Sequence, residues 1–133
     1  MREIKFRGYN KRNGWVYGNL LENDRPQEGS IYQILNKTTE SRFDVEEASI
    51  GQYTGFIDKN GKEIYEGDII AYEKHTNKMI YFNYPVPVYF DEEIGMWMAH
   101  DEEEVNNTQL YLINYECEIV GNTYEEELKE DKK

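Results

Sequence analysis

The stretch that most constrains what this chain folds into is residues 51–70, where apolar alternation and turn chemistry agree. Apolar and aromatic side chains lie on both sides of an Asp-Lys-Asn-Gly sequence at residues 58–61. Asn-Gly supplies the positive φ angles that a tight β-hairpin turn requires. A second turn sequence, Glu-Gly-Asp at 66–68, precedes a short apolar run at 69–72 that is typical of a buried strand. We therefore predict a hairpin followed by a strand at the centre of the chain.

Composition favours β structure in a small acidic protein. The 133 residues include 14% aromatic residues, with 12 Tyr, which predicts a core of large rings on strands. The 27 Asp and Glu exceed the 15 Lys and Arg and give a net charge of −12, which repels phosphate backbones and anionic lipids. We therefore expect neither a nucleic acid nor a membrane as partner. The single cysteine and the lack of a signal-like start favour a cytoplasmic location.

The rest of the chain is predicted to alternate strands with polar loops. Residues 2–9 alternate apolar and charged side chains, and an Asn-Gly turn after them predicts an opening hairpin. Pro85 and Pro87 cannot donate to a sheet ladder, which favours a bent or edge strand there. Strands are predicted at 2–9, 15–21, 30–35, 79–90, 96–100, 109–113 and 117–120. Polar loops are predicted at 22–29, 36–41, 73–78 and 101–107. Helical turns are predicted at 44–48 and at 125–129, the second capped by Thr123.

The predicted fold is mainly β. We expect an N-terminal β-hairpin region at residues 1–50, an SH3-like small barrel at 51–125, and a charged tail at 126–133 after a short C-terminal helical turn. The order of strands and tight turns between residues 67 and 120 matches the meander of such a barrel.

Three blocks of the sequence resemble the YopX family of bacteriophage and prophage proteins. They are MREIKFR at residues 1–7, GQYTG with DKNGKEIYEGDI at 51–69, and IVGNTYE at 119–125. The chain departs from the family pattern at residues 8–10, Gly-Tyr-Asn in place of Ala-Trp-Asp, and at 49–50, Ser-Ile in place of Thr-Val. The resemblance implies a phage origin and a β-rich fold with an SH3-like C-terminal part. It assigns no activity and no catalytic residue.

No pattern in the sequence predicts a catalytic, cofactor or metal site. Residues 58–61 lack the ligand spacing of a calcium loop, because the glycine comes at the fourth position rather than the sixth. His75 and His100 have no partner at metal-ligand spacing. Cys117 lies between two glutamates, which raise a thiol pKa and work against a nucleophile. We therefore predict that the protein is not an enzyme and carries no cofactor.

Two functions remain open. The favoured one is a protein-interaction module that docks on a host or phage protein through aromatic and acidic surfaces, including Glu102 and Glu103. The same acidic runs are also typical of solvated loops. The alternative is a binder of single-stranded nucleic acid that stacks bases on Tyr81, Tyr89 and Trp97. These five residues are the candidate partner-binding residues.

Overall fold

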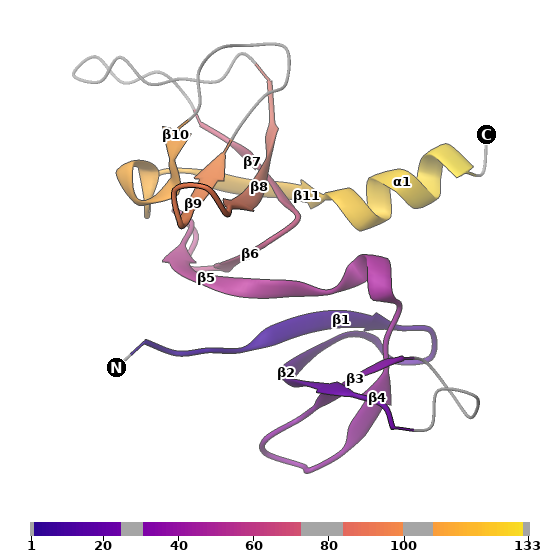
Figure 1. Ribbon diagram of the computed structural model, residues 1–133. Coiled ribbons are helices and arrows are strands. Elements are labelled where there is room, and N and C mark those ends of the chain that lie inside the picture. Colours follow the sequence, from indigo (N-terminus) through magenta and orange to yellow (C-terminus); the bar gives the residue numbers. More distant parts are fainter. Residues whose placement is uncertain (1, 25–30, 73–83, 100–107, 132–133) are drawn as a thin grey trace. The chain divides into compact units, whose positions relative to one another are not determined.

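The computed structural model describes residues 2–24, 31–72, 84–99 and 108–131. The chain divides into two compact units, Met1–Tyr53 and Thr54–Lys133. The predicted mainly β fold is confirmed, because the described residues form 11 strands in two antiparallel sheets and one α-helix near the C-terminal end (Figure 1). Within these ranges, no helix has the length and apolar character needed to cross a membrane.

The elements follow one another in short succession. In chain order they are β1 Phe6–Asn10, β2 Gly14–Glu22, β3 Tyr32–Leu35, β4 Arg42–Asp44, the 3-10 helix η2 Glu47–Ser49, β5 Gly51–Ile57, β6 Glu63–Tyr65, β7 Asp68–Ala71, β8 Val86–Asp91, β9 Met96–Ala99, β10 Thr108–Gln109, the 3-10 helix η3 Leu110–Ile113, β11 Glu118–Asn122 and α1 Thr123–Asp131.

The first unit is built on the predicted opening hairpin. β1 and β2 pair antiparallel, and Gly14 takes the positive φ of 79° that the Asn-Gly turn supplies. β2 then changes partner, pairing with β3 from Asn19 onward. A Cβ at Gly18 would lie 1.9 Å from the carbonyl oxygen of Leu35, so only glycine allows this close approach of the two strands. The core beneath them contains Val16, Ile34 and Val45, with Phe6, Leu20, Tyr32, Phe43 and Ile50 packed around it.

Residues 42–49 differ from the prediction. The sequence predicts a helical turn at 44–48 and no strand before it, but Asp44 belongs to β4 and the turn is the 3-10 helix η2. β4 is only three residues long and pairs with β3, with Phe43 opposite Ile34. A strand this short shows little alternation, so pairing with its neighbour rather than local pattern determines it.

The second unit contains the predicted central hairpin and a five-stranded sheet. β5 runs into this unit and has β6 as its neighbour beyond the turn, where Gly61 has a φ of 83°. The sheet has the order β10-β9-β8-β7-β11, so β7 to β10 form a meander and β11 returns to the other side of β7. As far as the described residues go, this order is open rather than closed into a barrel. The core contains Ile64, Ile70, Tyr72, Val86, Val88, Ala99, Leu110, Ile113 and Cys117.

Pro87 lies where β8 changes its pairing partner, and Pro85 precedes the strand. Pro87 is opposite Ile69 of β7, and the next residue, Val88, begins the pairing with β9. Since proline cannot donate to a ladder, it fits the position at which one pairing ends and the other begins. β8 therefore has neighbours on both sides, and its proline lies at the change of partner rather than on an outer edge.

The predicted strand at 109–113 is wrong beyond its first residue. The strand β10 ends at Gln109, and the apolar run that follows is the 3-10 helix η3. Leu110 and Ile113 are fully buried, whereas Tyr111 and Leu112 are 52% and 39% exposed. Residues three apart share a face of a 3-10 helix, so this spacing buries two apolar side chains and leaves the two between them in solvent.

The C-terminal helix begins at its predicted cap residue, and its cap is the residue before. Thr123 was expected to cap the helix, but it is the first helical residue. The cap is Asn122, whose Oδ1 accepts a hydrogen bond from the N–H of Glu125 at 2.9 Å. Asparagine is among the best N-cap residues, and it leaves Thr123 free to enter the first turn. The helix extends to Asp131 rather than ending after one turn.

Several predictions concern residues outside those that the structure describes. They are the first part of the strand at 79–90, the loops at 73–78 and 101–107, most of the loop at 22–29, and the side chains of His75 and His100.

Candidate functional site

The structure describes two of the five predicted partner-binding residues. Tyr81, Glu102 and Glu103 lie outside the described residues. Tyr89 and Trp97 lie on neighbouring strands, but Tyr89 is opposite Met98 and Trp97 is opposite Phe90. Since successive residues of a strand point to opposite faces, Tyr89 and Trp97 lie on different faces of the sheet. They do not form one stacking platform.

The environments of these two rings also differ. Trp97 packs against the core of the second unit and makes an edge-to-face contact with Phe90, with 5.0 Å between ring centroids. Burial, and to a lesser extent the carboxylate of Asp91, raises the pKa of Tyr89 above its ordinary value. Because of its contacts with the core and with Phe90, Trp97 is largely a packing residue, and only part of its side chain is exposed to solvent.

Asp58 is an acid with a structural role. Its side chain is 1% exposed, and the carboxylate accepts three backbone hydrogen bonds. Oδ1 accepts from the N–H groups of Asn60 and Lys62 at 2.9 Å each, and Oδ2 accepts from the N–H of Ile119 at 3.1 Å. The carboxylate therefore joins the hairpin turn to β11.

Where the structure describes the chain, no group of three His, Cys, Asp or Glu side chains is placed to hold a metal ion.

Cys117 is buried beside Asp58. The thiol is fully excluded from solvent, and burial together with the carboxylate of Asp58 raises its pKa to about 11. A thiol with this pKa stays protonated at neutral pH and is a poor nucleophile. The predicted direction of the pKa shift is therefore correct, with burial rather than the flanking glutamates as the largest cause.

The segment that follows η3 is held against the end of β5. Ile57 donates its N–H to Oδ1 of Asn114 at 3.0 Å, and its carbonyl accepts from Tyr115 at 2.8 Å. Two residues after Ile57, the N–H of Lys59 donates to the carbonyl of Cys117 at 2.8 Å. These bonds, together with those of Asp58, fix the backbone of residues 114–119.

The fixed segment carries exposed aromatic side chains. Leu110 and Ile113 anchor η3 in the core, while Tyr111, Leu112 and Tyr115 are 52%, 39% and 63% exposed. Tyr115 has a φ of 68°, in the left-handed region that bulky residues rarely adopt. We refer to Tyr111, Leu112 and Tyr115 as the 111–115 surface. These residues belong to the segment that connects β10 to β11 (Figure 1).

A strand at 109–113, as the sequence predicts, does not reveal this surface, because alternate residues of a strand face opposite ways. The signal that could have found it is the spacing of the apolar run, in which two apolar residues three apart flank a tyrosine and a leucine. The positive φ at Tyr115 had no such signal, because the preceding Asn114 is the residue type that more often adopts it.

The acidic charge of the chain belongs to the second unit. Residues 1–53 contain 8 Lys and Arg and 8 Asp and Glu, so their net charge is zero. Residues 54–133 contain 7 Lys and Arg against 19 Asp and Glu, which accounts for the entire net charge of −12. The 111–115 surface is thus part of a strongly acidic unit.

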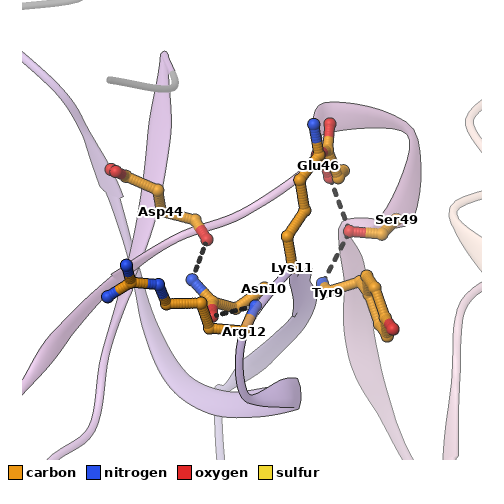
Figure 2. Close-up of polar contacts among 7 residues, drawn as sticks. All are labelled: Tyr9, Asn10, Lys11, Arg12, Asp44, Glu46 and Ser49. Carbon is orange, nitrogen blue, oxygen red and sulfur yellow. Dashed lines mark hydrogen bonds and ion pairs between the residues drawn. The ribbon is translucent and has the colours of Figure 1, made fainter. Parts of the chain in front are cut away.

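Figure 2 shows a second polar cluster, at the β1–β2 turn of the first unit. Oδ1 of Asn10 accepts backbone hydrogen bonds from the turn, and Nδ2 donates to the carbonyl of Asp44 at 2.8 Å. The hydroxyl of Ser49 donates to the carbonyl of Glu46 and accepts from the N–H of Tyr9 at 2.7 Å. These bonds fasten β4 and η2 to the opening hairpin, which gives the cluster a structural role.

The first unit also has a shallow hollow. Its volume is about 170 Å³, and an ion pair of 3.1 Å between Lys5 and Glu3 lies at its wall. Sites for small-molecule ligands and cofactors usually enclose roughly 300–1,000 Å³. The hollow is therefore too small to hold a cofactor of ordinary size.

The comparisons with known proteins identify a family. The model of the YopX protein family matches residues 5–128. The chain belongs to the YopX family. No curated protein matches the chain. Among solved structures, protein EF1440 from Enterococcus faecalis is similar, with 19% sequence identity, a TM-score of 0.51, and coverage of 96% of this chain and 97% of that chain. At this identity the likeness to EF1440 shows the fold alone.

Proposed function

We propose that this YopX-family protein is a non-catalytic interaction module whose second unit docks on a basic protein. The observation that carries the proposal is the division of charge, with −12 in residues 54–133 and zero in residues 1–53. A strongly negative unit speeds encounter with a positive partner and disfavours nucleic acid.

The two buried side chains that could take part in a reaction, those of Asp58 and Cys117, support a binding role over a catalytic one. Asp58 uses its carboxylate to hold three backbone N–H groups, and the Cys117 thiol is buried with a pKa of about 11. The exposed side chains of the second unit include the aromatic residues Phe90, Tyr111 and Tyr115, and aromatic residues are enriched at protein interfaces.

We further propose that the protein is an accessory protein of a phage or prophage that acts in the cytoplasm of the bacterial host. The resemblance to bacteriophage and prophage proteins supports the origin, and the single cysteine supports a reducing compartment. The SH3-like character of the second unit is part of the same proposal. It is supported by the meander of β7 to β10 and by the return of β11 beside β7.

The test is affinity capture with the full chain from a bacterial lysate, with and without nuclease treatment. We expect captured proteins of high isoelectric point that nuclease does not remove and that raised salt releases, because opposite charges attract less strongly when screened. Capture of nucleic acid alone, or of proteins that nuclease releases, would overturn the proposal.

A further inference from the structure

We propose that the 111–115 surface is the contact point for an arginine-bearing segment of the basic protein, with Tyr115 as its central ring. This inference rests on the proposed function and names the site and the partner chemistry that the function uses. Three observations support it: the positive φ of Tyr115, the solvent exposure of the Tyr111 and Tyr115 rings, and the net charge of −12 of residues 54–133.

The backbone at Tyr115 is unfavourable for a tyrosine. Its φ of 68° lies in the left-handed region, where an aromatic side chain crowds its own backbone. The conformation persists because the surroundings enforce it, through the hydrogen bond from its N–H to Ile57 and through the neighbouring bond between Ile57 and Asn114. Strained backbone that the fold maintains is concentrated at functional sites.

The Tyr115 ring contributes little to the folding of the unit. It is 63% exposed, whereas Leu110 and Ile113 on the same segment are fully buried and anchor it. Glycine or asparagine would satisfy this backbone more easily. A large ring at such a position therefore points to a use outside the folded core.

The charge of the unit selects the partner chemistry. Arginine stacks its guanidinium on the faces of tyrosine rings and is more weakly hydrated than lysine. The next residue, Glu116, is exposed, and one of its carboxylate oxygens accepts from the hydroxyl of Tyr72 at 3.3 Å. Two exposed tyrosines in a unit of charge −12 thus complement a side chain that is both cationic and planar. An acidic or phosphate-bearing partner would be repelled.

The experiment measures binding of the full chain to labelled peptides by fluorescence anisotropy at physiological salt. The probes are a peptide of alternating arginine and serine and its lysine–serine counterpart, with single-stranded DNA as the opposing ligand. The variants are Tyr115→Asn, which removes the ring and suits the positive φ, and Tyr115→Phe, which keeps the ring. Tyr17→Ala is the matched control, because Tyr17 is a tyrosine of the first unit that is 46% exposed.

We expect the native protein to prefer the arginine peptide, and Tyr115→Asn to weaken that binding by about three- to tenfold without lowering the melting temperature. Tyr115→Phe and Tyr17→Ala should bind like the native protein. Equal binding of both peptides, native-like binding by Tyr115→Asn, or preference for DNA would overturn the inference. If nuclease-resistant, salt-sensitive capture of basic proteins is still observed, the failure belongs to the 111–115 surface and not to the proposed function.

Discussion

Replacing Asp58 with alanine tests the role of the buried carboxylate in joining the central hairpin to β11. The substitution removes the acceptor of three backbone N–H groups, those of Asn60, Lys62 and Ile119. Asn60 and Lys62 are exposed turn residues whose N–H groups can reach water, whereas Ile119 is half-buried and packs against the core. An unsatisfied buried donor costs about 1–3 kcal/mol, and the two turn bonds add roughly 0.5–1.5 kcal/mol each.

Burying the charged carboxylate costs free energy in the native protein, and the alanine variant is relieved of that cost, which offsets part of the loss of the three hydrogen bonds. We therefore expect Asp58→Ala to lower the free energy of unfolding by about 2–4 kcal/mol. This is a large share of the roughly 5–15 kcal/mol typical of a folded protein. The assay is urea unfolding followed by tryptophan fluorescence in a Trp15→Phe background, which leaves Trp97 to report the second unit alone.

Asp91→Ala is the matched control. Asp91 also accepts backbone hydrogen bonds in a hairpin turn, from Glu93 at 3.0 Å and Ile94 at 3.4 Å. Both of these donors are exposed, so we expect a loss below about 1 kcal/mol. Equal losses in the two variants would refute the view that the Asp58 carboxylate links separate elements.

Two further predictions concern the turn and the thiol. Gly61→Val should lower the free energy of unfolding by about 1–3 kcal/mol through backbone strain alone, because φ is 83° and a Cβ there meets nothing within 4 Å; an unchanged thermal midpoint would contradict this. Because the pKa of Cys117 is raised to about 11 in the folded protein from 9.0, its contribution to stability should be complete below pH 9 and lost as the pH rises toward 11. The measurement is urea unfolding of the native protein and of Cys117→Ala across that range, and identical pH profiles would show that the thiol contributes nothing.

The sequence was most informative where local chemistry decides the backbone. The Asn-Gly pairs at 13–14 and 60–61 require positive φ at glycine, and both hairpins form as predicted. It was least informative for residues 109–113, because a short apolar run is compatible with a buried strand or with a helix that buries every third residue. Contacts with the core decide between these two outcomes, and such contacts involve residues distant in the sequence.

The candidate site could be predicted only in part, for a related reason. The alternation of β8 and β9 determines that neighbouring residues face opposite ways, but only the register shows that Trp97 is opposite Phe90 and not Tyr89. The exposed Tyr115 depends on hydrogen bonds to Ile57, which is far away along the chain. Net charge was visible from the start, yet its confinement to residues 54–133 becomes meaningful only with the boundary between the two units.

The most direct test of the proposed function is a titration of the native full chain against two ligands at low and physiological salt. One is a basic protein captured from a bacterial lysate, and the other is labelled single-stranded DNA. We expect binding to the protein that weakens as salt rises, and no measurable binding to DNA at physiological salt, because the charge of −12 opposes a phosphate backbone. Binding to DNA with a Kd of about 1 μM or tighter at physiological salt would contradict the account.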